Sequence, residues 1–194
     1  MITTEQVKEL RDKTGISVMQ CKKALEDAGG DIGKALEYLK AKGAEIASKK
    51  SERALHAGAI AAYIHGAGSV GSMVHLASET DFVARNEEFR ALAHDIAMHV
   101  AAMNPEFLKK EDISDADKSR AEEIFKDEVE KSGKPEEIKK KMLSGKIETY
   151  FNERTLLEQA FIKNPDQKIR NLVQNAIQKF GENIEVVSFV RFAA

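Results

Sequence analysis

The segment between Arg53 and Glu79 contains no Asp, Glu, Lys or Arg, although 32% of the whole chain is charged. Two runs within it, AIAAYIH (59–65) and VGSMVHLA (70–77), carry β-branched and aromatic residues and flank a glycine-rich turn, which is typical of a β-hairpin. The segment is long enough to cross a bilayer. Its glycines and histidines, however, are unfavourable in a membrane helix. We therefore expect a buried hairpin.

The residues before this segment have the periodicity of short helices. Thr3 and Ser17 each stand three residues before a glutamine, which is the capping-box signature of a helix start. Glycines follow each apolar repeat where a helix normally ends, the last of them at Gly43. We therefore predict a three-helix module over residues 1–43 and a linker helix, rich in alanine and charge, over residues 44–55.

Helical periodicity returns after the hairpin. An apolar stripe predicts one long helix from Glu87 to about Met103. Residues 106–141 carry many charges of both signs, which indicates solvated helices or an arm, and residues 166–180 form a further amphipathic pattern. The final run, IEVVSFVRF (184–192), is typical of a strand.

These elements indicate an α+β fold with a helical module at its N-terminal end. The hairpin and the last strand make a small three-stranded antiparallel sheet, and helices cover one face of it. With 194 residues the chain has room for one core and one small module. We assign the core to residues 56–194.

The charge of the chain limits the kind of partner that it can bind. A total of 30 basic residues against 32 acidic ones leaves a net charge of -2, whereas a nucleic-acid binder normally carries a clustered basic excess. Cys21 is the single cysteine, so an internal disulfide is impossible, and the N-terminus lacks a signal pattern. We expect a cytoplasmic protein that binds another protein, with no direct contact to nucleic acid or membrane.

Three features could carry other chemistry. The sequence GAGSVG (66–71) fits the dinucleotide fingerprint, but strand-like residues follow it where the fingerprint needs a helix. His94 and His99 lack metal-ligand spacing, and Cys21 lies beside two lysines without a nearby base. We expect a hairpin turn and no cofactor, metal site or catalytic residue. The rival hypotheses are a nicotinamide-dependent enzyme and a helical nucleic-acid-binding module.

The segment SETDFVARNE (78–87) places Phe82 and Val83 between charged residues. One interpretation is that both side chains close the core where the hairpin meets the long helix, in a scaffold without further activity. The other is an exposed apolar wedge with the Asp81 carboxylate beside it, which could enter a partner's pocket and disturb a bound cation or phosphate. The residues alone leave both interpretations open.

Several long motifs, in the same order along almost the whole chain, resemble the elongation factor Ts family. Residues 7–43 resemble its N-terminal module, a ubiquitin-associated-like three-helix fold, and ETDFVARNEEF (79–89) resembles its central signature. LLEQAFIK (156–163) and FGENIEVVSFVRF (180–192) resemble its C-terminal signatures. The length is similar to that of the short, single-core members, which implies a homodimer that presents a complete exchange surface.

The resemblance implies a guanine-nucleotide exchange factor that binds the GDP-bound form of elongation factor Tu and promotes GDP release during translation. Such a factor is not an enzyme in the chemical sense. Phe82 would insert near the partner's nucleotide site, and Asp81 would disturb the network around the magnesium ion, whose coordination geometry is strict. The implied contacts are the wedge residues Thr80, Asp81, Phe82 and Val83, and the docking candidates Leu10, Arg11, Thr14, Gly15, Val18 and Met19.

Overall fold

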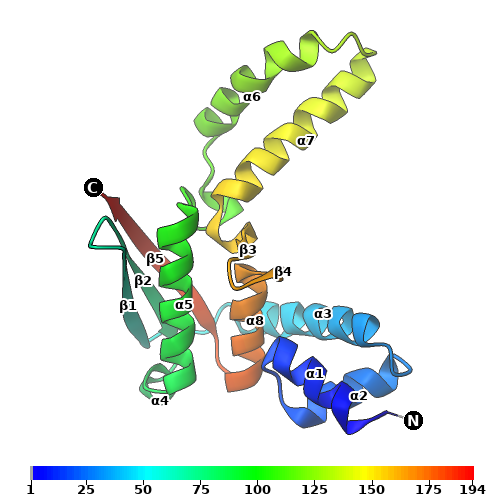
Figure 1. Cartoon of the computed structure of the whole chain (residues 1–194), viewed down its shortest axis with the longest axis vertical. Coiled ribbons are helices and arrows are strands. Elements are labelled where there is room, and N and C mark those ends of the chain that lie inside the picture. The colour runs from blue at the N-terminus through cyan, green and yellow to red at the C-terminus, as the bar shows by residue number, and fades with distance from the viewer. Residues whose placement is uncertain (1) are drawn as a thin grey trace.

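Three antiparallel strands lie at one side of the molecule, in the order β1 (Ala57–His65), β2 (Val70–Ser78) and β5 (Ile184–Ala193). The computed structural model describes residues 2–194 and is drawn in Figure 1. The predicted hairpin is confirmed: β1 and β2 pair along their whole length, and positive φ angles at Gly66 and Gly68 close the turn between them. The three-stranded sheet and the α+β class are therefore both as the sequence predicts.

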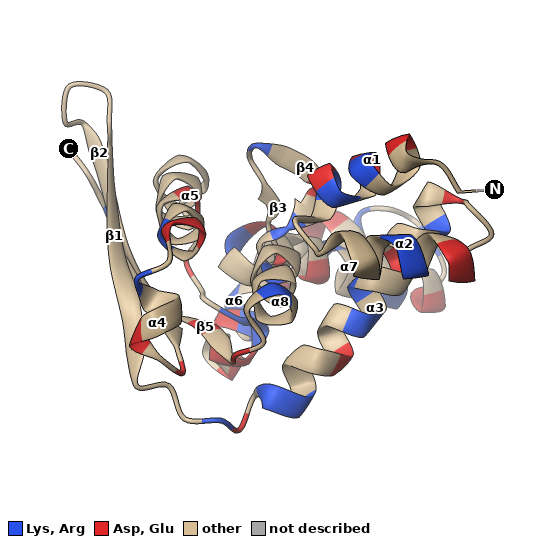
Figure 2. Cartoon of the chain, turned by 90° about the horizontal axis from the view of Figure 1, so that it is seen from below, with Lys and Arg blue, Asp and Glu red and all other residues tan. Residues whose placement is uncertain are grey.

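Helices cover one face of this sheet only, as Figure 2 shows. Helix α5 (Glu87–Met103) packs on β1 and β2, and α8 (Ile169–Phe180) packs against α5 and β5. The predicted long helix begins and ends as expected, because Asn86 caps its first turn and Asn104 leaves it in a left-handed conformation. The main core fills the space between these elements, and its largest fully buried members are Val74, Leu76, Phe89, Ile96, Leu156, Ile169 and Ile184.

The N-terminal helices α1 (Thr4–Thr14), α2 (Val18–Asp27) and α3 (Ile32–Lys50) enclose a second, separate cluster of buried apolar side chains. The predicted end of the third helix at Gly43 is wrong, because α3 continues through this glycine to Lys50. A glycine inside a helix costs about 1 kcal/mol relative to alanine. The packing of the following turn against the main core offsets this cost.

An arm projects from the body, opposite the N-terminal helices (Figure 1). It consists of α6 (Asp115–Glu130) and α7 (Glu136–Arg154), which pack against each other. The expected solvated arm is thus present. No helix within residues 2–194 is long and apolar enough to cross a membrane. The remaining elements are short: α4 (Asp81–Ala84), η1 (Lys110–Asp112), η2 (Leu156–Glu158), β3 (Ala160–Phe161) and β4 (Asn164–Lys168).

A buried histidine joins α5 to the root of the arm. The Nδ1 atom of His99 accepts a hydrogen bond from the backbone N–H of Ile162 at 3.4 Å, so the proton belongs on Nε2. This Nε2–H donates to the side chain of Gln159 at 2.9 Å, and the Gln159 amide donates to the carbonyl of Glu153 at 2.6 Å. Burial lowers the pKa of His99, against a smaller raising effect of the Gln159 hydrogen bond. The network therefore needs a neutral imidazole.

Because of His99, we expect the free energy of unfolding to decrease as the pH is lowered. In the unfolded chain this imidazole takes up a proton at an ordinary pKa of about 6.5, whereas the folded protein resists protonation. The stabilisation is present above that pKa and is lost as the pH falls below it. Denaturant titrations at a series of pH values should show a shallower loss for His99→Gln than for the wild type. Equal slopes for His99→Gln and the wild type would contradict the prediction.

Candidate partner-binding site

The segment SETDFVARNE forms the end of β2, the single turn of α4 and the start of α5. Thr80 caps α4, because its Oγ1 accepts a hydrogen bond from the N–H of Val83 at 3.5 Å. The Val83 side chain is 4% exposed and belongs to the main core, whereas that of Phe82 is 81% exposed. Burial is therefore the right interpretation for Val83 and the wrong one for Phe82, which projects into solvent.

The carboxylate beside this aromatic ring already has a partner in the chain. Asp81 forms an ion pair with Arg85 one turn later, at 2.9 Å, and both side chains are exposed. Exposed pairs of this kind contribute at most about 1 kcal/mol. Asp81 can therefore exchange Arg85 for a group on another molecule at low cost.

The start of α4 is held by a turn that is distant in the sequence, and the residue pattern gives no indication of this contact. Thr80 donates two hydrogen bonds to the carboxylate of Glu182, one from its N–H at 3.0 Å and one from its hydroxyl at 2.6 Å. Glu79 accepts a hydrogen bond from the N–H of Asn183 at 2.6 Å and pairs with Arg53 at 3.4 Å. More than a hundred residues separate the two sides, so no local motif could have disclosed them.

The docking candidates in the N-terminal helices divide by exposure. Leu10 is completely buried in the helical cluster, and Thr14 is 7% exposed with its hydroxyl bonded to the Leu10 carbonyl. Their side chains hold the α1–α2 corner and do not reach the surface. Gly15 ends α1 with a φ of 69°, a conformation that a residue with a side chain adopts at a cost.

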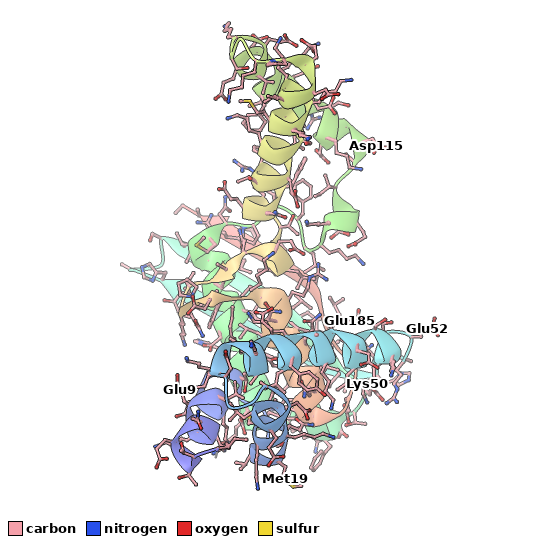
Figure 3. All side chains as sticks on the ribbon, turned by 90° about the vertical axis from the view of Figure 1, so that its right-hand side faces the viewer. Glu9, Met19, Lys50, Glu52, Asp115 and Glu185 are labelled. Carbon is pink, nitrogen blue, oxygen red and sulfur yellow. The ribbon has the colours of Figure 1, made fainter. Side chains whose placement is uncertain are left out.

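The other docking candidates lie on the surface. Arg11 and Val18 line a groove of about 340 Å³ between α1 and α2, together with Val7 and Lys22. Met19 is 83% exposed, and Figure 3 shows it pointing away from the body at the outer side of α2. The groove combines apolar and basic side chains, and Met19 directly follows Val18 in the chain; we call the groove and Met19 together the N-terminal surface. The surface lies at the same end of the molecule as α4, opposite the arm (Figure 1).

A second candidate surface is the uncovered face of the sheet. Paired residues of the three strands form rows across it, and the rows centred on Met73 and Gly71 also contain Ile64, Val190 and Phe192. The large apolar side chains on this face are all at least 41% exposed: Ile60, Ile64, Met73, Val190 and Phe192. An apolar area of this kind on a folded chain indicates a contact with another protein.

The features that suggested other chemistry have structural roles. The glycines of GAGSVG form the hairpin turn, and β2 follows where a dinucleotide site would need a helix. Cys21 is buried, and burial raises the pKa of its thiol, which opposes nucleophilic reactivity. Within residues 2–194, no group of three or more His, Cys, Asp or Glu side chains could hold a metal ion.

Comparison with known proteins gives one consistent result. A family model described as "Elongation factor TS" matches residues 3–194. A protein named "Elongation factor Ts" from Thermodesulfovibrio yellowstonii is 50% identical over 191 residues, which cover 98% of this chain and 95% of that protein. Proteins of the same name from Carboxydothermus hydrogenoformans and Thermosipho melanesiensis are each 46% identical over 192 residues, covering 88% and 98% of their own lengths.

The contrast between Phe82 and Val83 predicts a small effect on stability for one substitution and a large loss for the other. Phe82→Ala removes an exposed ring and should change the free energy of unfolding by no more than about 0.5 kcal/mol. Val83→Ala removes buried carbon atoms and should destabilise the protein by about 2 kcal/mol. Chemical denaturation of both variants checks this. A large loss for Phe82→Ala would mean that the ring packs in the core after all.

Proposed function

This chain belongs to the elongation factor Ts family of translation elongation factors, and we propose from this premise that it is a guanine-nucleotide exchange factor for elongation factor Tu. In this proposal it binds the GDP-bound form and promotes the release of GDP. The observation that supports it most is the 81% exposure of Phe82 on a short helix whose next residue is anchored in the core. An exposed aromatic ring on a helix that is anchored in the core is suited to enter a pocket of a partner.

We propose that each of the four wedge residues has a different role in nucleotide release. Phe82 supplies the apolar contact near the nucleotide of elongation factor Tu, and Val83 anchors the helix that carries it. Asp81 leaves Arg85 and disturbs the side chains and water around the partner's magnesium ion. Magnesium requires nearly ideal octahedral coordination, so a small displacement of its ligands weakens the hold on GDP. Thr80 caps the helix.

The N-terminal helices would bind the G domain of the same partner at a distance from the nucleotide. We propose direct contacts by Arg11, Gly15, Val18 and Met19, while Leu10 and Thr14 shape that surface from within. Residues 1–43 would thus be the docking module and residues 56–194 the exchange and dimerisation core. The continuous helix α3 makes residues 44–50 of the linker stiff, so docking would fix where the wedge arrives.

Exchange of this kind is a coupling between two binding events. If the bound factor lowers the affinity of elongation factor Tu for GDP, GDP lowers the affinity for the factor by the same ratio. No covalent bond forms or breaks, so we assign a binding function and no enzymatic reaction. A cytoplasmic location follows from this assignment, because the elongation step takes place there.

We further propose that the chain acts as a homodimer through the uncovered sheet face. A twofold interface requires a surface that is complementary to itself, and an apolar face without charged residues in its central rows meets this condition. Stacked sheets pack about 10 Å apart with interdigitating side chains, which would bury the five exposed apolar residues. The helices on the opposite face leave this surface unobstructed (Figure 2).

Stopped-flow release of fluorescent GDP from elongation factor Tu tests the exchange function. The wild-type protein should accelerate release, and Phe82→Ala should lose at least about tenfold of that acceleration, as expected for a buried aromatic anchor of an interface. Asp81→Ala should also slow release. The control Ile124→Ala removes a 57% exposed apolar side chain on the arm and should act like the wild type. No acceleration by folded wild-type protein would refute the proposed function.

Sedimentation velocity tests the dimer. The wild type should sediment as a dimer at micromolar concentration, whereas Ile64→Lys should be a monomer, because dimer formation would bury an unpaired charge. The folded monomer should tolerate this lysine, since position 64 is 70% exposed. Ile124→Lys places the same charge on the arm and should leave the dimer intact. A dimeric Ile64→Lys would place the interface elsewhere.

A further inference from the structure

The exposed ring of Phe82 stands on a helix that is too short to fix its own direction. Helix α4 has four residues, and a single helical turn gains too little from its own hydrogen bonds to be stable by itself. The side chains of Val83 and Ala84 attach its inner side to the core. They leave the start of the helix, where Phe82 projects, to be held by other contacts.

The start of α4 is held by one carboxylate. Both oxygens of Glu182 accept hydrogen bonds from Thr80, with Oε2 at 3.0 Å from the backbone N–H and Oε1 at 2.6 Å from the hydroxyl. The same hydroxyl oxygen accepts the N–H of Val83 at 3.5 Å. Hydrogen bonds to a charged acceptor are shorter and stronger than neutral ones. A continuous chain of contacts therefore runs from Glu182 through Thr80 into the first turn of α4.

The next residue on each side, Glu79 and Asn183, forms a similar contact in which the donor and acceptor sides are exchanged. The backbone N–H of Asn183 donates to Glu79 at 2.6 Å, and the Asn183 side chain donates to the carbonyl of Arg53 at 3.1 Å. The hydrogen bond from the N–H of Asn183 lowers the pKa of Glu79 below its ordinary value, and the charge of Arg53 makes a smaller contribution in the same direction. Two consecutive residues before α4 are thus bound to two consecutive residues after α8. We call this set, Glu79 and Thr80 with Glu182 and Asn183, the clamp.

We propose that Glu182 is a positioning residue, which acts through Thr80 to hold Phe82 in the direction in which it enters elongation factor Tu. This inference rests on the proposed exchange function. Binding costs free energy for each side chain or loop that must become ordered, and a clamp that orders α4 in the free protein removes that cost in advance. A residue that only stabilises the fold would affect exchange whether or not Phe82 is present. The two roles therefore differ in a measurable way.

The direction of the side chain at position 82 can be measured without any partner. The chain contains no tryptophan, so Phe82→Trp introduces a single tryptophan, which can be excited at a wavelength that its three tyrosines do not absorb. Time-resolved anisotropy should show larger rapid motion of this indole when Glu182→Ala is added. Glu182→Gln keeps one carbonyl oxygen as an acceptor for Thr80, so the indole should move more than with Glu182 intact and less than with Glu182→Ala. Glu52→Ala, which removes an exposed carboxylate between α3 and β1 (Figure 3), should change nothing.

The GDP-release assay then tests the positioning role itself, after thermal unfolding has shown that each variant is folded. Glu182→Ala should slow the stimulated release roughly three- to tenfold, the size expected when a few ordered groups become free. Glu182→Gln should restore part of the loss. In a Phe82→Ala background the additional Glu182→Ala substitution should have a much smaller effect, because the ring is absent and only Asp81 is left on α4 to position.

Two results would overturn the inference. One is unchanged motion of the indole at position 82 when Glu182→Ala is combined with Phe82→Trp. The other is an equal slowing of release by Glu182→Ala with and without Phe82. Failure of the proposed function gives a different result, since the wild type would then not accelerate GDP release at all. In that case the anisotropy would still decide whether Glu182 holds the side chain at position 82.

Discussion

The burial of one face of the β1–β2–β5 sheet under α5 and α8 is the contact on which the other features depend. Each large apolar side chain that it removes from water contributes about 1.5–3 kcal/mol. Side chains alternate across a strand, so this burial also decides which residues face outward. In β2 it places Val74 and Leu76 inside and Met73 outside. The same contact thus builds the core, leaves the other face of the sheet apolar and exposed, and fixes the end of the central strand β2, from which α4 starts.

The N-terminal helices form their own cluster and are joined to the core mainly along α3, which packs on α8. Polar links supplement this contact: the side chain of Gln178 donates to that of Gln20 at 3.2 Å, and Gln167 donates to the carbonyl of Lys13. The contact of α3 with α8 therefore sets the position of the proposed docking surface relative to α4. The mechanism that we propose needs this fixed separation, because the factor would hold its partner at one point and disturb it at another.

The exchange mechanism that we propose requires a balance between exposure and rigidity. A buried Phe82 could not reach a partner, and a ring on a mobile loop would lose much of its contact energy to ordering. The structure combines 81% exposure of Phe82 with the buried side chain of Val83 and the hydrogen bonds of Thr80. The pairing of Asp81 with Arg85 adds a charge that is weakly held and thus available.

Local patterns predicted most of the secondary structure, because local interactions decide where helices and turns begin and end. The reciprocal hydrogen bonds of Thr3 and Gln6, the left-handed glycines at 15 and 181 and the GAGSVG turn all act over a few residues. Two predicted boundaries were wrong. Distant contacts outweighed local ones in α3, which packing on the core carries past Gly43. Helix α8 begins at Ile169 and not at residue 166, because residues 164–168 pair with the short strand β3 as β4.

The sequence by itself determined the α+β class, the hairpin, the capped helices and the family motifs, since these depend on residue order and spacing. The tertiary structure alone decided that Phe82 is exposed while Val83 is buried, and that Leu10 and Thr14 are buried beneath the proposed docking surface. It alone brought Glu182 to Thr80 across 102 positions of the chain. Exposure and contacts of this kind depend on which elements pack together in space, and the spacing of residues along a chain does not carry that information.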